Sequence, residues 1–153
     1  ENDNTPFTPA VSTIVALDEA LQLLLREGLE HAFARHVALG RACRAAVKAM
    51  GLELYSPDSD RAAILTAVLT PEGIDAVALR LALRDRHGIT IAGGHGEIVD
   101  RLFRLGHIGH VGIDEVALAV TAIEEELARA GAEIIPGVAA DAARVAYASA
   151  VEP

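Results

Sequence analysis

The run Leu102-Phe103-Arg104-Leu105-Gly106-His107-Ile108 has the length and apolar content of a β-strand, with an arginine inside it. A guanidinium in such a setting cannot be buried without an anionic partner. Arg104 therefore requires a negatively charged group. That group is either the carboxylate of a bound acid, held by two parallel hydrogen bonds, or an internal side chain such as Asp100 or Glu97.

Three further strands are expected upstream of this run. Ile89 to Ala92 is one, and it is followed by the loop Gly93-Gly94-His95-Gly96, whose glycines permit backbone conformations that other residues avoid. Ala63 to Leu69 is an apolar run of strand length, and Leu52 to Tyr55 alternates like a short strand. Together these segments predict a small sheet.

Helices are predicted where apolar residues recur at steps of three and four. The first has Thr8 as its N-cap and Pro9 at its first helical position. In the last helix we expect Glu124 to Glu126 to be largely solvated. The first helix ends at Gly28, and the second runs from Leu29 to Gly51. The third runs from Ile74 to Gly88. The fourth extends over Val116 to Leu127, with Gly131 beyond its end.

The resulting order is two helices, then strand, strand, helix, strand, strand, helix. This order predicts an α+β domain with a small antiparallel or mixed sheet and its helices on one face. We expect the main domain to cover residues 1–131, and residues 132–153 to form a C-terminal tail. In that tail, Val138 to Ala150 is either a peripheral helix or a frayed end.

Composition excludes several classes of function. The 153 residues carry a formal net charge of −9 and a single lysine, Lys48, which argues against nucleic-acid binding. No apolar run approaches the ~20 residues that span a bilayer, so no membrane association is expected. Cys43 is the only cysteine and lies among apolar residues, which indicates a buried thiol and a cytoplasmic setting.

A second candidate site lies at the start of the first helix, in Asn4-Thr5-Pro6-Phe7-Thr8-Pro9. It places hydroxyl and backbone N–H groups at the positive end of a helix, where a phosphate fits. The alternative is that Thr8 only caps the helix.

Two other groups of residues contain side chains of the kinds found in metal and cofactor sites. His95, His107 and His110 with Glu97 have side chains that suit zinc, but their spacing matches no compact metal motif, so no metal is expected. Lys48 lies on the polar side of the second helix, where a lysine stays solvated and protonated.

Taken together, these motifs resemble the alanine–glyoxylate and serine–pyruvate aminotransferases, within the class V pyridoxal-phosphate aminotransferases. The resemblance runs from about Thr5 to Gly131 and covers the small C-terminal domain of such enzymes. Its motifs, in order, are Thr5-Pro6-Phe7-Thr8-Pro9-Ala10-Val11-Ser12, Gly28-Leu29-Glu30, Gly51-Leu52-Glu53-Leu54, Ile91-Ala92-Gly93-Gly94-His95-Gly96 and Phe103-Arg104-Leu105-Gly106-His107-Ile108-Gly109.

The resemblance implies an amino-group transfer between a small amino acid (alanine, serine or glycine) and a 2-oxo acid (glyoxylate or pyruvate). It implies pyridoxal 5'-phosphate as cofactor and a homodimer. Arg104 corresponds to the arginine that binds the substrate α-carboxylate. Thr8, with Thr5 beside it, corresponds to the threonine that reaches the cofactor phosphate of the other subunit.

The Schiff-base lysine of this family lies in the large domain, upstream of these motifs. No residue of this chain is therefore expected to be catalytic, and the chain alone is expected to be inactive. Two other hypotheses remain open. The chain is a free-standing small-molecule or regulatory module with a ferredoxin-like arrangement, or a fragment that dimerises through surfaces normally covered by the missing domain.

Overall fold

The structure is a computed structural model that describes residues 7–59 and 61–151. It divides into two compact units, one ending at Phe33 and the other starting at Ala34. The boundary falls within one helix, α2 (Leu29–Ala49), and each unit is described by itself below.

The first unit contains helix α1 (Val11–Glu27). It ends as predicted at Gly28, whose φ of 85° lies in the left-handed region that glycine adopts readily. The prediction for its start was wrong, because the N-cap position is Ala10 and no side chain caps the helix. The N–H of Val11 donates to the carbonyl of Pro9 at 2.9 Å, and this tight turn places Thr8 two residues before the cap position.

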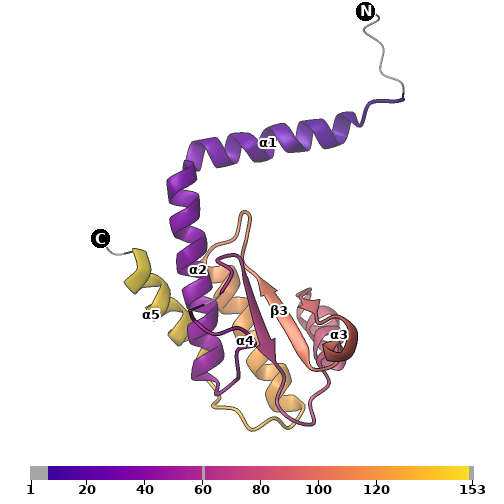
Figure 1. Ribbon diagram of the computed structural model, residues 1–153, viewed down its shortest axis with the longest axis vertical. Coiled ribbons are helices and arrows are strands. Elements are labelled where there is room, and N and C mark those ends of the chain that lie inside the picture. The colour runs from indigo at the N-terminus through magenta and orange to yellow at the C-terminus, as the bar shows by residue number, and fades with distance from the viewer. Residues whose placement is uncertain (1–6, 60, 152–153) are drawn as a thin grey trace, which may run out of the picture. The chain divides into compact units, whose positions relative to one another are not determined.

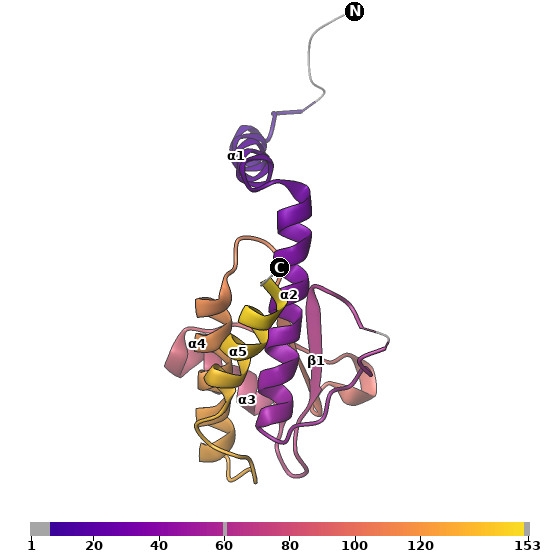
Figure 2. The same ribbon diagram turned by 90° about the vertical axis from the view of Figure 1, so that its left-hand side faces the viewer.

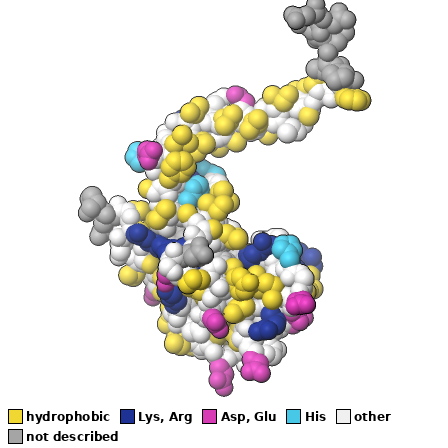
Figure 3. All heavy atoms as spheres, viewed as in Figure 1, with side chains coloured by type: hydrophobic (Ala, Val, Ile, Leu, Met, Phe, Trp, Pro, Cys, Tyr) yellow, Lys and Arg dark blue, Asp and Glu magenta, His cyan; other side chains and the backbone are white. Residues whose placement is uncertain are grey.

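The surface of α1 is mostly apolar. None of its residues is buried, and Figure 3 shows hydrophobic side chains along the whole helix. An exposed apolar surface of this kind marks a region that another molecule or domain covers. The exposed large side chains are Val11, Ile14, Val15, Leu17, Leu21, Leu23 and Leu25.

The second unit is built around a three-stranded antiparallel sheet in the order β1-β3-β2 (Figure 1). Its strands are β1 (Leu65–Leu69), β2 (Ala92–Gly93) and β3 (Leu102–Gly106). The register places Arg104 of β3 opposite Ala67 of β1 and Ala92 of β2. The predicted α+β fold with a small sheet is confirmed, and the sheet is antiparallel.

The sheet is smaller than the sequence predicts. The strand expected over Leu52 to Tyr55 is reduced to an isolated bridge between Leu54 and Val68. The strand expected over Ile89 to Ala92 forms only at Ala92 and Gly93. The alternation of apolar residues correctly predicts which side chains pack inward. The hydrogen bonds of a sheet also need a neighbouring strand, and a segment at the edge of a sheet has a neighbouring strand on one side only.

The helices of the second unit lie on one side of the sheet (Figure 2). They are the part of α2 from Ala34 onward, α3 (Ala76–His87), α4 (Ile113–Arg129) and α5 (Ala139–Val151), and a short 3-10 helix η1 (Gly96–Ile98) follows β2. Asp75 caps α3 by accepting the N–H of Val77 at 2.7 Å. Residues 139–151 are helical rather than frayed, and α5 buries Ala139 and Ala143 completely.

The core lies between the sheet and these helices. It combines side chains from α2, β1, α3, β3, α4 and α5. Each fully buried Leu, Val, Ile or Phe side chain stabilises the fold by roughly 1.5–3 kcal/mol. The largest fully buried apolar members are Phe103, Leu39, Met50, Leu83, Ile123, Leu127, Val47, Val68 and Val120.

The prediction that Glu124 to Glu126 are solvated was wrong for two of the three residues. Only Glu125 is exposed, whereas Glu124 is 7% and Glu126 3% exposed. The Oε1 atom of Glu124 accepts hydrogen bonds from the backbone N–H groups of Val138 at 3.1 Å and Ala139 at 3.4 Å. Glu124 thus satisfies backbone donors at the start of α5. The tertiary fold thus gives this buried carboxylate its partners.

Glu126 is buried among cations of two helices. His87 of α3 donates to its Oε1 at 2.8 Å, and Arg86 and Arg129 form ion pairs with it. Burial raises the pKa of Glu126, but the hydrogen bond from His87 and the charges of Arg86 and Arg129 outweigh it, so the net pKa is lowered. Charge pairing explains how this glutamate is accommodated in the interior.

Two predictions about α2 are confirmed. Lys48 is exposed and pairs with Asp58, whose pKa falls to about 2 because Lys48 and Arg44 donate hydrogen bonds to it. Cys43 is buried, and burial raises the pKa of its thiol to about 12. Among the described residues, no helix combines the length and the hydropathy needed to cross a membrane.

Candidate anion-binding site

Arg104 projects from the middle strand of the sheet. Side chains of a strand alternate between its faces, and its neighbours Phe103 and Leu105 both point into the core. Arg104 therefore lies on the opposite face, where it is partly buried. Its cross-strand neighbours are the alanines Ala67 and Ala92, which leave room beside a long side chain.

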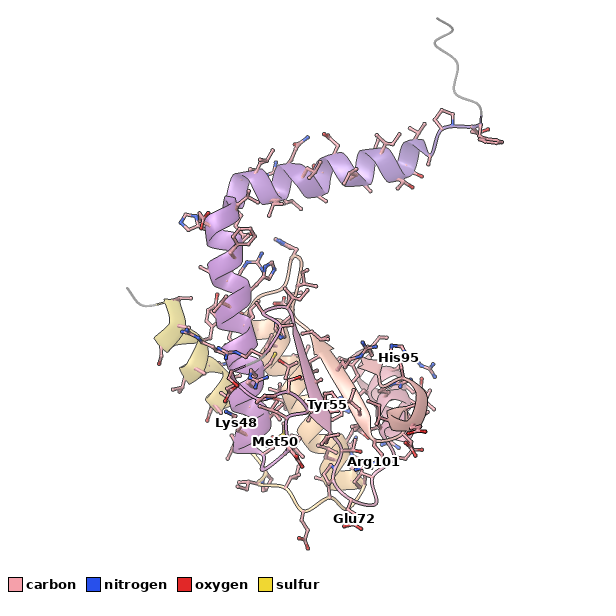
Figure 4. The ribbon with its side chains drawn as sticks, viewed as in Figure 1. Lys48, Met50, Tyr55, Glu72, His95 and Arg101 are labelled. Carbon is pink, nitrogen blue, oxygen red and sulfur yellow. The ribbon has the colours of Figure 1, made fainter. Side chains whose placement is uncertain are left out.

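The guanidinium of Arg104 is held by the last residue of β2 and by the loop that follows it. Its Nε donates to the backbone carbonyl of Gly93 at 2.8 Å, and its Nη2 donates to Nε2 of His95 at 3.1 Å. Figure 4 shows His95 beside α3, at the β2 edge of the sheet. These two bonds use two of the five N–H groups of the guanidinium.

No carboxylate pairs with Arg104 in the described part of the chain. Neither Asp100 nor Glu97 forms an ion pair with it, so the internal partner considered from the sequence is contradicted. The other N–H groups of the guanidinium make no hydrogen bond there either. A partly buried cation with unused donors and no counter-charge is suited to binding an external anion.

Two glycines of β2 and its following loop closely approach other groups, and at Gly94 the neighbour is rigid backbone. A Cβ on Gly93 would lie 1.6 Å from Nη1 of Arg80, and a Cβ on Gly94 would lie 2.2 Å from the carbonyl oxygen of Ile98. The N–H of Gly94 donates to the carbonyl of Leu102 at 2.9 Å, which ties the loop to β3. The bond to β3 and the close approach of Gly94 to Ile98 position the loop beside Arg104.

Arg80 was missed by the sequence analysis. It belongs to α3, is partly buried, and makes no hydrogen bond or ion pair with any residue that the structure describes. Its position four residues after the buried Ala76 and one after Leu79 places it at the border of the core-facing side of α3. That helical spacing is the signal that would have identified it.

Two arginines approach the loop. Arg104 and Arg80 approach Gly93 from β3 and α3, and His95 adds an imidazole. In a chain with a net charge of −9, this local concentration of cationic groups creates a positive field that attracts an anion.

The threonines predicted to contact a phosphate precede the first helix. Thr8 belongs to the first unit, is exposed, and its hydroxyl makes no hydrogen bond with the described residues. Thr5 lies outside the described residues.

The histidines weighed as metal ligands occupy different environments. His95 bonds to Arg104, His107 is fully buried with its Nε2 3.0 Å from Oγ1 of Thr66, and His110 is exposed. Within residues 7–59 and 61–151, no three metal-ligating side chains gather into a group. His36 accepts the N–H of Gly109 at 3.2 Å, which suits a packing role.

Comparison with known proteins shows that the chain is homologous to the C-terminal portion of class V aminotransferases. It is 43% identical over 140 residues to a pyridoxamine–pyruvate transaminase of Mesorhizobium japonicum, covering 90% of this chain and 36% of that protein. It is 43% identical over 127 residues to a protein named soluble hydrogenase, small subunit, of Synechococcus, covering 83% and 33%. No family model matches the chain.

A solved structure shares the fold. The crystal structure of ureidoglycine–glyoxylate aminotransferase from Bacillus subtilis superposes with a TM-score of 0.86 at 35% identity, covering 95% of this chain and 37% of that one. The chain thus spans about a third of the length of the curated relatives it matches.

Proposed function

Because the chain is homologous to the C-terminal portion of class V aminotransferases, we propose that the complete protein transfers an amino group between a small amino acid and a 2-oxo acid such as glyoxylate or pyruvate. Arg104 binds the α-carboxylate that both substrates share. The observation that carries this proposal is the absence of any carboxylate partner for Arg104 among the described residues.

The hydrogen bonds of Arg104 determine how a carboxylate approaches. Its Nε is occupied by the carbonyl of Gly93, so the free donors lie on Nη1 and Nη2. A carboxylate accepts two parallel bonds from these two nitrogens, in the fork geometry that arginine provides. This arrangement fixes the orientation of the acid as well as its position, which places its α-carbon reproducibly for reaction.

The homologues depend on pyridoxal phosphate, which supplies an electron sink at the α-carbon when bound. The described residues do not form a complete site for this cofactor. Lys48 is exposed and paired with Asp58, which does not suit a Schiff-base lysine. As part of the proposal, the lysine comes from the upstream portion that the relatives possess, and Thr8, with Thr5, contacts the cofactor phosphate of a second subunit.

The apolar surface of α1 supports an assembly of this kind. Its exposed Val, Ile and Leu side chains are covered when the chain is joined to the upstream portion and paired as a homodimer. The buried, protonated thiol of Cys43 is compatible with the cytoplasmic location that belongs to the same proposal.

Steady-state kinetics of the full-length protein test the proposal. Arg104→Gln is expected to raise the KM for the amino donor about 100-fold, because losing a charged hydrogen-bonded pair costs about 3 kcal/mol, while the cofactor absorbance stays unchanged. The matched control is Arg101→Gln, an exposed arginine three residues away. Unchanged kinetics in Arg104→Gln reject the carboxylate clamp. Carboxylate binding without transamination by the full-length protein favours the regulatory module instead.

A further inference from the structure

We propose that Arg80 is a second anion-binding residue beside Arg104, and that the two arginines together bind a short acid with two carboxylates. The inference deepens the proposed function and rests on it, because one of the two carboxylates is the α-carboxylate that Arg104 binds. Arg80 binds the other, distal carboxylate, so the acids that the site accepts include short dicarboxylic ones. The starting observation is that both arginines approach Gly93.

The carbonyl of Gly93 points toward the open edge of the sheet. The N–H of the next residue, Gly94, donates to the carbonyl of Leu102 on β3 at 2.9 Å. Successive residues of a strand direct their backbone groups to opposite sides, so the carbonyl of Gly93 points away from β3. No further strand lies there, since β2 is an edge strand. The Nε of Arg104 donates to this carbonyl at 2.8 Å, so the guanidinium of Arg104 lies at the edge of β2.

The guanidinium of Arg80 reaches the same residue from α3. Its Nη1 lies 1.6 Å from the position that a Cβ on Gly93 would take, so it fills the space that the missing side chain leaves. His95, two residues further along, lies beside α3 at this edge (Figure 4). Standard bond lengths then place Nη1 of Arg80 at most about 9 Å from Nε of Arg104. One short acid can therefore contact both cations.

The two arginines have unused donors and no counter-charge. In the described part of the chain, Arg80 makes no hydrogen bond or ion pair, and neither Glu97 nor Asp100 pairs with either arginine. Two like charges at this separation repel each other, and because both side chains are partly buried, water screens the repulsion less. A partly buried charge without a partner also costs free energy.

These costs favour a ligand with two negative groups. A single carboxylate on Arg104 leaves Arg80 unpaired, whereas a second carboxylate on the same molecule neutralises Arg80 as well. Each guanidinium provides the planar fork of N–H groups that a carboxylate accepts. The pair of arginines therefore selects for the number of carboxylates in the ligand as well as for its orientation.

Calorimetry on the full-length protein with two acids tests the inference. Succinate and butyrate have carbon chains of the same length, and only succinate has a second carboxylate. The wild-type protein is expected to bind succinate at least about tenfold more tightly than butyrate. In Arg80→Gln this preference is expected to fall to about twofold or less, while the affinity for butyrate stays unchanged. The matched control is Arg84→Gln, which removes an exposed arginine of the same helix and is expected to keep the wild-type preference.

The outcomes separate this inference from the proposed function. Equal affinities for succinate and butyrate in the wild type, or an unchanged preference in Arg80→Gln, overturn the role of Arg80 and leave the clamp of Arg104 intact. The same conclusion follows if Arg80→Gln weakens both acids equally, since Arg80 then does not bind the distal carboxylate. Butyrate binding that Arg104→Gln leaves unchanged overturns the clamp, and this inference with it. If Arg80→Gln fails to fold, Arg80→Met, which keeps an apolar stem, repeats the test.

Discussion

His107 Nε2 lies 3.0 Å from Oγ1 of Thr66 inside the core, where the histidine has no exposed surface. The backbone N–H of His107 donates to the carbonyl of Ile64 at 3.0 Å. Helix α2 approaches closely, since a Cβ on Gly40 would lie 3.1 Å from Cε1 of the ring. His107 therefore joins the end of β3 to β1 under α2, and it is a packing residue rather than a substrate contact.

Acid is expected to destabilise the chain through His107. Burial lowers its pKa to about 4, with a smaller contribution from His36, whereas an unfolded histidine titrates near 6.5. Between these values the unfolded state binds the proton and the folded state does not, so stability is lost as the pH falls from about 6.5 toward about 4. The loss is about 1 to 3 kcal/mol, measured by urea unfolding at several pH values.

The variant His107→Gln identifies the source of this pH dependence. Its free energy of unfolding is expected to vary less between pH 6.5 and 4 than that of the wild type, whatever its absolute value. His110→Gln, which changes an exposed histidine, keeps the wild-type slope. Equal slopes for wild type and His107→Gln would contradict the assignment.

Glu126→Gln is expected to destabilise the second unit by about 1 to 3 kcal/mol. It leaves Arg86 and His87 of α3 and Arg129 of α4 without their shared carboxylate. The neighbouring Glu125→Gln is the matched control, because Glu125 is exposed and its ion pair with Arg129 spans 3.7 Å, so a change below about 0.5 kcal/mol is expected. Urea unfolding compares the two, and similar losses would refute the role of the buried cluster.

Alanine substitutions at the two loop glycines are expected to differ. In Gly94→Ala the new Cβ meets the backbone carbonyl of Ile98, which cannot move without distorting η1, so a loss of about 2 to 3 kcal/mol is expected. In Gly93→Ala the obstacle is the flexible end of Arg80, so the loss is expected to stay below about 1 kcal/mol. Thermal unfolding measures both, and the reverse order would show that the loop is held differently.

Cys43 is expected to resist thiol reagents in the folded chain. Its pKa of about 12 leaves almost no thiolate at pH 8, and the side chain is buried. In the folded chain, a disulfide reagent is expected to release its coloured thiolate only at the rate at which the chain unfolds. In concentrated urea, the release is expected at once. Rapid labelling without denaturant would mean that the thiol is accessible in the folded state.

The helix ends were predictable because their signals are local. Gly28, Gly51, Gly88 and Gly131 were each predicted to end or follow a helix, and all four have a positive φ. That conformation depends on a few consecutive residues, and glycine adopts it without steric cost. The N-terminus of α1 failed because a tight turn at Pro9 competed with the cap expected from Thr8.

The candidate site was predictable in part. Arg104 stood out because a charged residue interrupts an apolar strand, and the glycines after β2 marked a loop beside it. The approach of Arg80 to Gly93 and the bond from Arg104 to His95 were not predictable, since they depend on how α3 and the loop meet across the sheet edge.

The sequence by itself thus determined the order of elements, most helix ends, the buried thiol of Cys43 and the arginine that needs an anion, because periodicity and capping act over neighbouring residues. Only the tertiary structure decided that Glu124 and Glu126 are buried and that Arg104 pairs with no carboxylate of residues 7–59 and 61–151. Those outcomes depend on groups far apart in the chain, as when His87 reaches Glu126 across 39 residues, and packing alone brings such groups together.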